Sequence, residues 1–445
     1  MFLIDSVGLK LITIYLSRLK IIAAHKKDPI IIRKSELKIS ERAKKHETKA
    51  KRAVKKIVAP ILEYLIISNL GHLYIKLLLT PEQVKRKFTM KLGFFTRPLH
   101  PLNKDWQTCL KEDREAIILA DELGFSEAYV GEHLSDKAEN ITSCVAFIAS
   151  LAYETQNIRL GTGTVNIPNL HPVHIAGQVA MIDHMLNGRF NFGISPGGLI
   201  SDAELFGNLE KDRSEMFLEG INTILEIWSK EAPYDIKGKY WDVSTENTII
   251  SEIGQGYMTK PLQKPHPPII VTAVAPYSKG ITEAAARGWK PISADIIMPN
   301  WVKTHWGKYK EGCEKSNLDI KTEDWRIAKT VFVADDLNTA KEYALGPNSP
   351  YVFYFKQLFK KFVALGKLDL FKTSIDQPDK EITLETVCEK LIIWGTPEKV
   401  VEDLSAFKDQ VGEYGMLMYA GVDWLDPAIA KKSMTLMAEK VNPYL

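Results

Sequence analysis

The segment YVGEHLSD, residues 129–136, places a glycine, a carboxylate and an imidazole next to one another. Imidazole titrates near neutral pH, so His133 suits general acid–base chemistry or hydrogen bonding to a reacting oxygen. We interpret Glu132 as an inward structural partner for a backbone amide or an arginine, and Asp136 ends the cluster. Because a histidine at a strand end is more often structural than catalytic, the rest of the chain must decide its role.

Three further segments combine glycines with small polar residues: GTGTVNIP (161–168), GISPGGLISD (193–202) and TAVAPYSKG (272–280). Glycine allows a backbone to approach a ligand closely. The third segment leads into the helical pattern ITEAAARG, and the free N–H groups of a helix N-terminus favour anions. The pattern predicts a phosphate-bearing ligand held by Tyr277, Ser278 and Lys279, with N–H groups of SPGG and the Ser195 hydroxyl nearby.

Short β-rich runs alternate with helical patterns along the chain after Met90. The runs span 91–95, 127–131, 158–167, 189–194, 268–274, 291–297, 326–334 and 415–420. Eight alternations of strand and helix predict an α/β fold, a (β/α)8 TIM barrel with insertions, whose active site lies at the C-terminal ends of the strands. A dinucleotide-binding Rossmann fold is rejected, because Gly161 and Gly163 lack a third glycine and a following helix.

Two segments are longer than ordinary loops. Residues 233–264 have a hairpin-like pattern of glycines and aromatics, and residues 346–381 form an aromatic, lysine-rich insertion. Long insertions on the catalytic face commonly act as lids or binding loops, and plain surface segments are an equal alternative for each.

The composition separates a basic leader from an acidic body. Residues 1–89 contain 20 Lys and Arg against 7 Asp and Glu, whereas residues 90–445 contain 38 against 48. The four cysteines lie far apart, which argues against a zinc site and a disulfide framework and fits a reducing cytoplasm. We therefore expect no metal and a cytoplasmic location.

The leader, residues 1–89, is expected to be a basic helical extension in front of a barrel domain at 90–445. Its apolar run 61–80 contains Glu63, His72 and Lys76, which favours a surface helix over a membrane span. We interpret it as a partly ordered extension or translated upstream sequence, with Met90 as the functional start. Its charge suits weak contact with an anionic membrane surface, and no nucleic-acid-binding fold accompanies it.

From Met90 to the C-terminus, the chain resembles the bacterial-luciferase-like flavin-dependent monooxygenases. The runs FFTRPLHP and GFSEAYVGEHLSD, and the long segment 158–207 from IRLGTGTVNIPNLHP to DAELFG, are similar to the limonene-monooxygenase-type branch. The resemblance implies reduced FMN at the barrel mouth, reaction with O2 to a C4a-peroxyflavin, and oxygenation of a small hydrophobic organic substrate. It further implies a separate NAD(P)H:flavin reductase and a homo-oligomer.

By resemblance, His133 matches the catalytic histidine, and the Gly163–Thr164 bond matches a non-proline cis peptide that lies against the flavin ring. Ser195 stands where light-emitting members carry a reactive cysteine, and Pro196 replaces an arginine that helps to hold the phosphate. This departure shifts phosphate binding to the backbone of the 275–279 loop. The full expected set is His133 as catalytic residue; Gly163, Thr164, Ser195, Pro196, Gly197, Ala275, Tyr277, Ser278 and Lys279 for the cofactor; and Phe95, Arg97 and Tyr129 for the substrate pocket.

Two other functions remain open at this point. A deazaflavin coenzyme on the same barrel would transfer hydride without O2. A non-catalytic flavin-binding protein, in which the basic leader is the functional part, is the other alternative. Oxygen consumption coupled to product formation separates the first from a monooxygenase.

Overall fold

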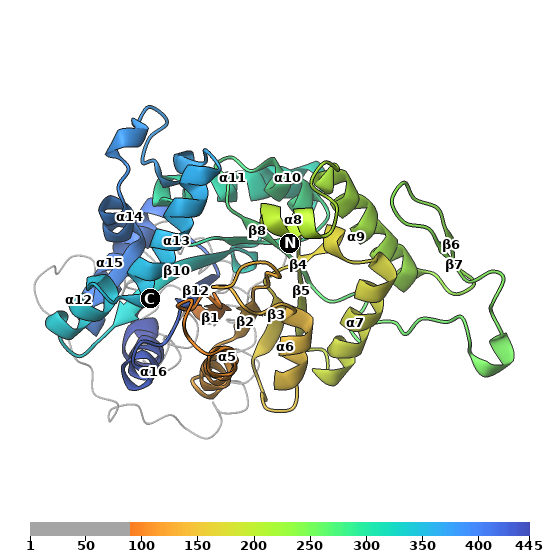
Figure 1. Ribbon diagram of the computed structural model, residues 1–445, viewed down its shortest axis with the longest axis horizontal. Helices are drawn as coiled ribbons and strands as arrows, with labels where there is room; N and C mark the ends of the chain where they lie inside the picture. The colour runs from red at the N-terminus through yellow and green to blue at the C-terminus, as the bar shows by residue number, and fades with distance from the viewer. Residues whose placement is uncertain (1–89) are drawn as a thin grey trace, which may run out of the picture. The chain divides into compact units, whose positions relative to one another are not determined.

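Eight parallel strands form a closed barrel in the computed structural model, which describes residues 90–445 (Figure 1). Each strand pairs with the next in chain order, and the last pairs with the first. The strands are β1 (Lys91–Thr96), β2 (Glu127–Val130), β3 (Arg159–Thr162), β5 (Phe190–Ser195), β8 (Ile269–Ala273), β9 (Lys290–Ser293), β10 (Arg326–Val333) and β12 (Met416–Gly421). The eight predicted strands and the barrel are confirmed, while the expectations for residues 1–89 lie outside the described residues.

Helices follow the strands and surround the barrel in Figure 1. They are α5 (Trp106–Glu122), α6 (Cys144–Leu151), α7 (Pro172–Met185), α9 (Arg213–Ser229), α10 (Lys279–Ala286), α11 (Pro299–Lys315), α15 (Pro397–Val411) and α16 (Pro427–Leu436). Their starts follow from local chemistry: the Asp105 carboxylate accepts from Thr108 N at α5, and His171 Nδ1 accepts from Val173 N at α7. No helix of the described chain combines the length and apolar character needed to cross a bilayer.

The barrel interior is packed with side chains from alternate strand positions. The buried Tyr129 ring lies there with Ile270, Ile292, Met416 and Met418. Gly161 on the neighbouring strand makes room for it, because a Cβ there would lie 2.5 Å from a Tyr129 ring carbon. The barrel interior is therefore a filled core, and the expected site residues follow the C-terminal ends of its strands.

A buried ion pair crosses the N-terminal part of this interior. Glu127 on β2 accepts from Arg326 Nε at 2.6 Å and from Arg326 Nη2 at 2.8 Å, and the Tyr129 hydroxyl donates to the same carboxylate at 2.7 Å. Both charged side chains are less than a tenth exposed. The two residues are 199 positions apart, so their pairing depends on closure of the barrel.

The third predicted strand, 158–167, is divided in two. β3 ends at Thr162, the Gly163–Thr164 peptide is cis, and a short strand β4 (Val165–Asn166) then pairs with the end of β5. The cis geometry expected from the resemblance is confirmed. A further strand, β11 (Ile392–Gly395), pairs with the second half of β10 and was not predicted.

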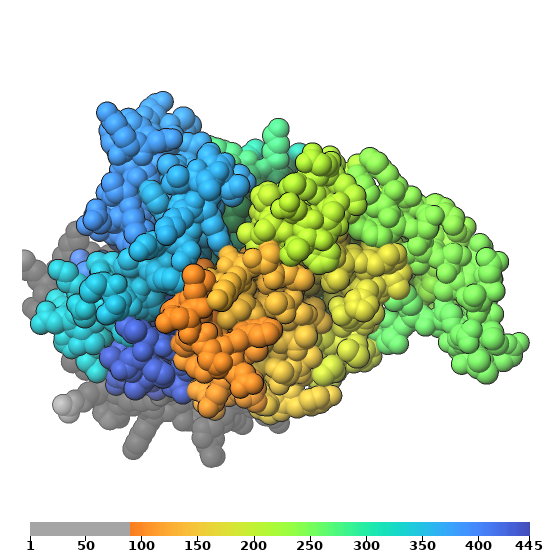
Figure 2. All heavy atoms as spheres, in the orientation of Figure 1, coloured from red at the N-terminus to blue at the C-terminus, as the bar shows by residue number. Residues whose placement is uncertain are grey.

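The two insertions contain secondary structure of their own. Residues 233–264 hold the antiparallel hairpin of β6 (Asp235–Ile236) and β7 (Val243–Ser244), which projects away from the barrel in Figure 1, so the hairpin pattern is confirmed. The second insertion holds α13 (Pro350–Ala364), between α12 (Leu337–Leu345) and α14 (Leu384–Leu391). In Figure 2, α13 and the short helix α8 (Ile200–Leu205) rise on either side of a hollow in the same face.

The run DHMLNGR predicts a structural ion pair between Asp183 and Arg189 that ties helix to strand, and the structure shows that this prediction is wrong. Asp183 accepts from the Gln263 backbone and side-chain nitrogens, at 2.8 and 2.7 Å. Arg189 instead donates to the carbonyl oxygens of Thr155 and Ile158. The end of α7 is thus bonded to the segment before β8, and the start of β5 is bonded to the segment before β3, so each side chain is satisfied by a partner distant in sequence.

Candidate active site

His133 lies just after β2, at the C-terminal end of the barrel, between two carboxylates. Its Nδ1 lies 3.4 Å from Asp202 Oδ2 of α8, and its Nε2 lies 3.4 Å from Glu139 Oε2. The ring is 28% exposed. Asp202 is itself held by the backbone N–H groups of Leu134 and Ser135, at 3.3 and 2.8 Å. The imidazole is therefore fixed in place and still reachable.

The two carboxylates favour the protonated ring. Burial opposes the charged form, but the hydrogen bond to Asp202 and the charge of Glu139 outweigh it, so the pKa of His133 lies above its ordinary value of 6.5. Lys361 acts in the opposite direction. Burial alone would raise the pKa of Asp202, yet the hydrogen bonds from His133 and Ser135 lower it to about 2. Asp202 thus remains an anion beside the imidazole.

Small polar groups form a hydrogen-bond network beside the cis peptide. Thr164 Oγ1 donates to Ser195 Oγ at 2.7 Å, and Ser195 Oγ donates to Asn166 Oδ1 at 2.8 Å. Gly197 N donates to Ser195 Oγ at 3.2 Å, and Gly197 has a φ of 83°, which only glycine adopts readily. Pro196 next to it is exposed. The structure therefore brings together the expected residues of the third and fourth strand ends, because β4 pairs with β5.

The loop after β8 presents the N-terminus of α10. Ser278 is the N-cap residue, and its side chain makes no capping hydrogen bond. Ile281 N donates to Ser278 O at 3.2 Å, so the N–H groups of Lys279 and Gly280 at the start of the helix are the donors available to an anion. Ala275 O accepts from His305 Nε2 at 2.9 Å, and Tyr277 N donates to Thr304 Oγ1 at 2.9 Å. Burial lowers the pKa of His305 to about 4, so the neutral ring anchors the loop.

The two loops expected to bind the cofactor follow adjacent strands of the barrel. β5 pairs with β8, with Ile194 opposite Val271, so the segment after Ser195 and the segment 275–279 leave the barrel from adjacent strands. Lys279 is exposed at the first position of α10. The two loops that leave these adjacent strands carry backbone N–H groups, hydroxyls and one ammonium, which are donor types that suit phosphate.

A model of the luciferase-like monooxygenase family matches residues 90–413. The chain belongs to this family. Limonene 1,2-monooxygenase of Rhodococcus erythropolis is 25% identical over 358 residues, which cover 79% of this chain and 86% of that protein. The 4-hydroxyprotoasukamycin monooxygenase of Streptomyces nodosus subsp. asukaensis is 26% identical over 360 residues, which cover 80% of this chain and 92% of that protein.

A solved structure of the family has the same fold. It is the oxygenating constituent of 3,6-diketocamphane monooxygenase from Pseudomonas putida, in complex with FMN. It superposes with a TM-score of 0.73 at 25% identity, covering 80% of this chain and 98% of that one. The barrel read from the sequence and the one in this family are therefore the same architecture.

In the present protein, two of the three residues expected in the substrate pocket are bonded to other protein groups. Tyr129 is completely buried and its hydroxyl bonds Glu127 and Asn191, so we assign it to the barrel core rather than the pocket. Arg97 is 4% exposed, forms an ion pair with Asp295, and lies 3.8 Å from the Tyr354 ring centroid. Its donors are thus directed into the protein.

Phe95 remains as the expected pocket residue with a partly exposed ring. It stacks on Tyr129 with ring centroids 6.4 Å apart. A Cβ on Gly163 would lie 3.2 Å from a Phe95 ring carbon, so the cis peptide and this ring are close neighbours. Phe95 therefore places an apolar surface next to the backbone expected to contact the flavin.

Several residues of the site were not predicted as such. Asp202 and Glu139 flank His133, and Asn166 completes the Ser195 network. Glu132, by contrast, accepts from Cys144 N at 2.9 Å, which agrees with its predicted role as a partner of a backbone amide. Asp202 is the last residue of the segment GISPGGLISD. Its distance from His133 along the chain did not predict that the two side chains are in contact. Only the placement of α8 over the β2 end reveals the pair.

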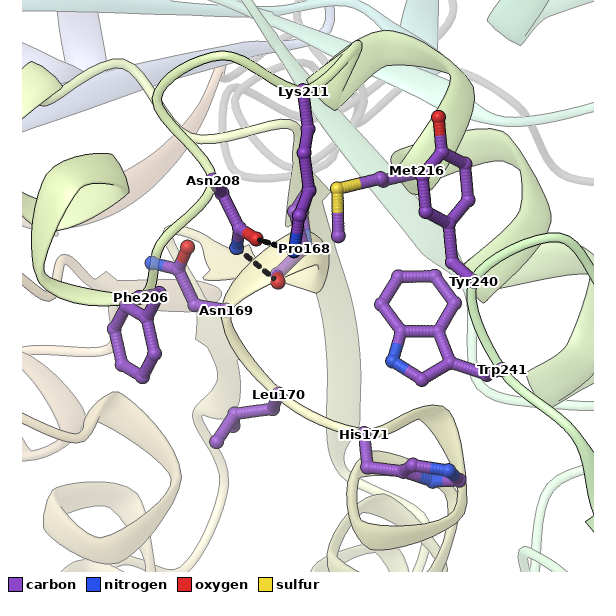
Figure 3. A pocket seen from close by; sticks show the side chains of 10 residues that line it. All are labelled: Pro168, Asn169, Leu170, His171, Phe206, Asn208, Lys211, Met216, Tyr240 and Trp241. Atoms are coloured by element: carbon purple, nitrogen blue, oxygen red, sulfur yellow. Dashed lines mark hydrogen bonds between the residues drawn. The ribbon is translucent and has the colours of Figure 1, made fainter.

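A separate concavity of about 240 Å³ lies outside this set (Figure 3). It is lined by the segment after β4, the α8–α9 loop and the tip of the hairpin, where Tyr240 and Trp241 lie. Inside it, Lys211 Nζ donates to Asn208 Oδ1 at 3.0 Å. None of the ten lining residues belongs to the expected site, so the concavity receives no role in the proposed reaction.

His100, which follows β1, is buried in a charged cluster rather than exposed to substrate. Its Nδ1 lies 2.6 Å from Asp423 Oδ1 and its Nε2 lies 3.1 Å from Asp113 Oδ2. Lys104 Nζ bridges Glu112 and Asp423, at 2.5 and 2.7 Å. His100, Glu112 and Asp423 have the types of metal ligands, but the lysine already occupies the cation position between the carboxylates.

We expect His100 to make stability fall at alkaline pH. Burial opposes its charge, but Asp113 and Asp423 raise its pKa from 6.5 to about 9. A raised pKa stabilises the folded state fully below pH 6.5, and this contribution of about 3 kcal/mol is lost as pH rises through about 9. Chemical denaturation between these pH values should show the loss in the wild type and a much flatter profile in His100→Gln. An equal decrease of the unfolding free energy with pH in the wild type and in His100→Gln would contradict this prediction.

Proposed function

We propose that this protein uses reduced FMN and O2 to oxygenate a small hydrophobic organic substrate. The observation that carries the proposal is the arrangement at one end of the barrel. His133, held between Asp202 and Glu139, shares that end with the cis Gly163–Thr164 peptide and the open N-terminus of α10. An anion site, a close backbone approach and an acid–base group together fit a phosphorylated flavin.

The residues that would hold FMN follow from the donors present. The N–H groups of Lys279 and Gly280, with the Ser278 and Lys279 side chains, would bind the phosphate in place of an arginine at position 196. The backbone at Gly163, Thr164 and Gly197 would border the ring system. Reduced FMN, when bound, supplies the electrons that activate O2.

The chain's own residues then have three tasks. The α10 N-terminus orients the cofactor through its phosphate. Phe95 and the helices α8 and α13 limit the access of water, which matters because water and stray protons divert reduced oxygen to H2O2. His133 holds or transfers a proton at a ring nitrogen, and the charge of Asp202 keeps that ring in position.

The source of reduced FMN is proposed to be a separate NAD(P)H:flavin reductase. The part of the chain that the structure describes is one barrel with insertions and contains no second nucleotide-binding fold. A relative from Acinetobacter baylyi, 26% identical over 343 residues, is named as the oxygenase component of a flavin-dependent trigonelline monooxygenase. That name supports a two-component system. A homo-oligomer stays a prediction.

The substrate class is proposed from the same relatives. Two of them are named for limonene and diketocamphane, which are small hydrophobic cyclic compounds. The apolar Phe95 ring beside the cis peptide is compatible with such a molecule. A terpene or terpene-like ketone is therefore the first substrate to test.

The test supplies chemically reduced FMN to the full chain without oxygen and then admits isotopically labelled O2. Terpenes, cyclic ketones, aldehydes and alkanes form the substrate panel, with products identified by mass spectrometry. We expect one labelled oxygen atom in a product and O2 consumption that depends on FMN. Hydride transfer with a reduced deazaflavin and no O2 would overturn the proposal, and so would tight FMN binding without turnover of any substrate.

A further inference from the structure

The insertion helix α13 reaches the loop that carries His133. Lys361, near the end of α13, lies with its Nζ 2.5 Å from Asp136 Oδ2 and 3.0 Å from Glu139 Oε2. Both carboxylates belong to the loop after β2. Lys361 is 222 positions from Glu139 along the chain, so only the folded insertion brings them together.

One oxygen atom joins the lysine to the histidine. Glu139 Oε2 is the atom that contacts Lys361 Nζ, and it is also the atom 3.4 Å from His133 Nε2. The side chains of Lys361, Glu139 and His133 are 29%, 14% and 28% exposed. At this depth charges are screened less than at the open surface, so an ammonium that shares a carboxylate with an imidazole affects the proton on that ring.

Charged groups from three parts of the chain surround the His133 ring. Among the charged groups of residues 90–445 that contact or act on His133, the cation is Lys361, and Asp202 supports the imidazolium from the opposite side of the ring, through α8. The groups that face or neighbour His133 are Glu132, Asp136 and Glu139 from its own segment, Asp202 from α8 and Lys361 from α13.

We propose that Lys361 is a positioning residue that sets the charge state of His133 through Glu139. The Lys361 ammonium partly neutralises the Glu139 charge that stabilises the imidazolium. It also repels the proton on the His133 ring directly. A plain tether of α13 to the loop would need the ion pair with Asp136 but would leave the protonation of His133 unchanged. The proposal rests on the proposed acid–base function of His133 for its catalytic consequence, and its titration is measurable without that function.

The experiment compares Lys361→Met, Lys361→Arg and Asp136→Asn in the full chain without flavin. Histidine carbon–proton NMR signals are followed from pH 5 to 10, a range set about the ordinary histidine pKa, and the signal missing in His133→Gln identifies the ring. Lys360→Met is the matched control, since Lys360 is exposed and has no ion pair among the described residues. Circular dichroism and thermal melting establish that each variant is folded.

The expected results have opposite signs. Lys361→Met should move the His133 midpoint upward, raising the ratio of imidazolium to imidazole near neutral pH about threefold or more, since half a pKa unit is a threefold change. Asp136→Asn should lower the His133 midpoint, because the variant removes a negative charge and leaves Glu139 as the carboxylate that pairs with Lys361. Lys361→Arg and Lys360→Met should stay near the wild type.

An unchanged or lowered midpoint in Lys361→Met, with the fold intact, overturns the proposal. If Lys361→Met does not fold, an unchanged midpoint in Asp136→Asn overturns it instead. The pH dependence of coupled turnover, measured in the same variants, should shift in the same direction as the NMR midpoint. A shifted midpoint with no change in the turnover profile would leave the Lys361 inference standing and would count against His133 as the acid–base group.

Discussion

Replacing His133 with alanine is expected to lower the rate of substrate oxygenation coupled to oxidation of reduced FMN by about 100-fold or more, the usual contribution of a general acid–base group. The ring is held by Asp202 and Glu139 and is 28% exposed, so it is both oriented and accessible. The side chains that contact it among the described residues, Asp202 and Glu139, are carboxylates, so no second imidazole takes its place. Product and H2O2 should be quantified after mixing reduced enzyme with O2, and H2O2 should increase as product falls.

The control for this variant is His174→Ala. His174 is exposed on α7, where its ring bonds Gln178 at 2.9 Å, so its loss should leave turnover near the wild type. FMN affinity should change little in either variant, because His133 follows β2 whereas the proposed phosphate donors follow β8. Full coupling in His133→Ala would show that the histidine is only a structural residue.

Replacing Arg326 with methionine is expected to lower the free energy of unfolding by about 3–5 kcal/mol, because the change leaves a buried carboxylate without its partner. Glu127 is 9% exposed at its side chain and accepts two hydrogen bonds from Arg326. After the substitution only the Tyr129 hydroxyl would remain bonded to it. Urea denaturation followed by fluorescence and circular dichroism measures the change.

The double variant Glu127→Gln with Arg326→Met is the matched control. It removes the unpaired charge as well as the ion pair, so it should regain part of the lost stability. A single variant that loses less than about 1 kcal/mol would show that Glu127 is relieved by protonation or by water, contrary to the burial seen here. A double variant no more stable than the single one would contradict the charge-based explanation.

The strand positions were predictable because period-two patterns and flanking glycines are local properties of the chain. All eight barrel strands were found this way, and the two insertions were recognised by their length. The division of 158–167 was missed, since β4 depends on pairing with the end of β5. Strand β11 was missed because its residues, IIWG, follow a helix directly and continue the edge of β10 rather than close the barrel.

The sequence by itself determined the alternation of strands and helices, and with it the placement of His133, Ser195 and the 275–279 loop at one end of a parallel barrel. It did not determine which charges surround the histidine. Asp202 and Lys361 lie 69 and 228 positions beyond it in the printed numbering and reach it from α8 and α13. Local patterns encode the direction of a strand, whereas contacts between loops arise only when the barrel closes and the second insertion packs against the loop after β2.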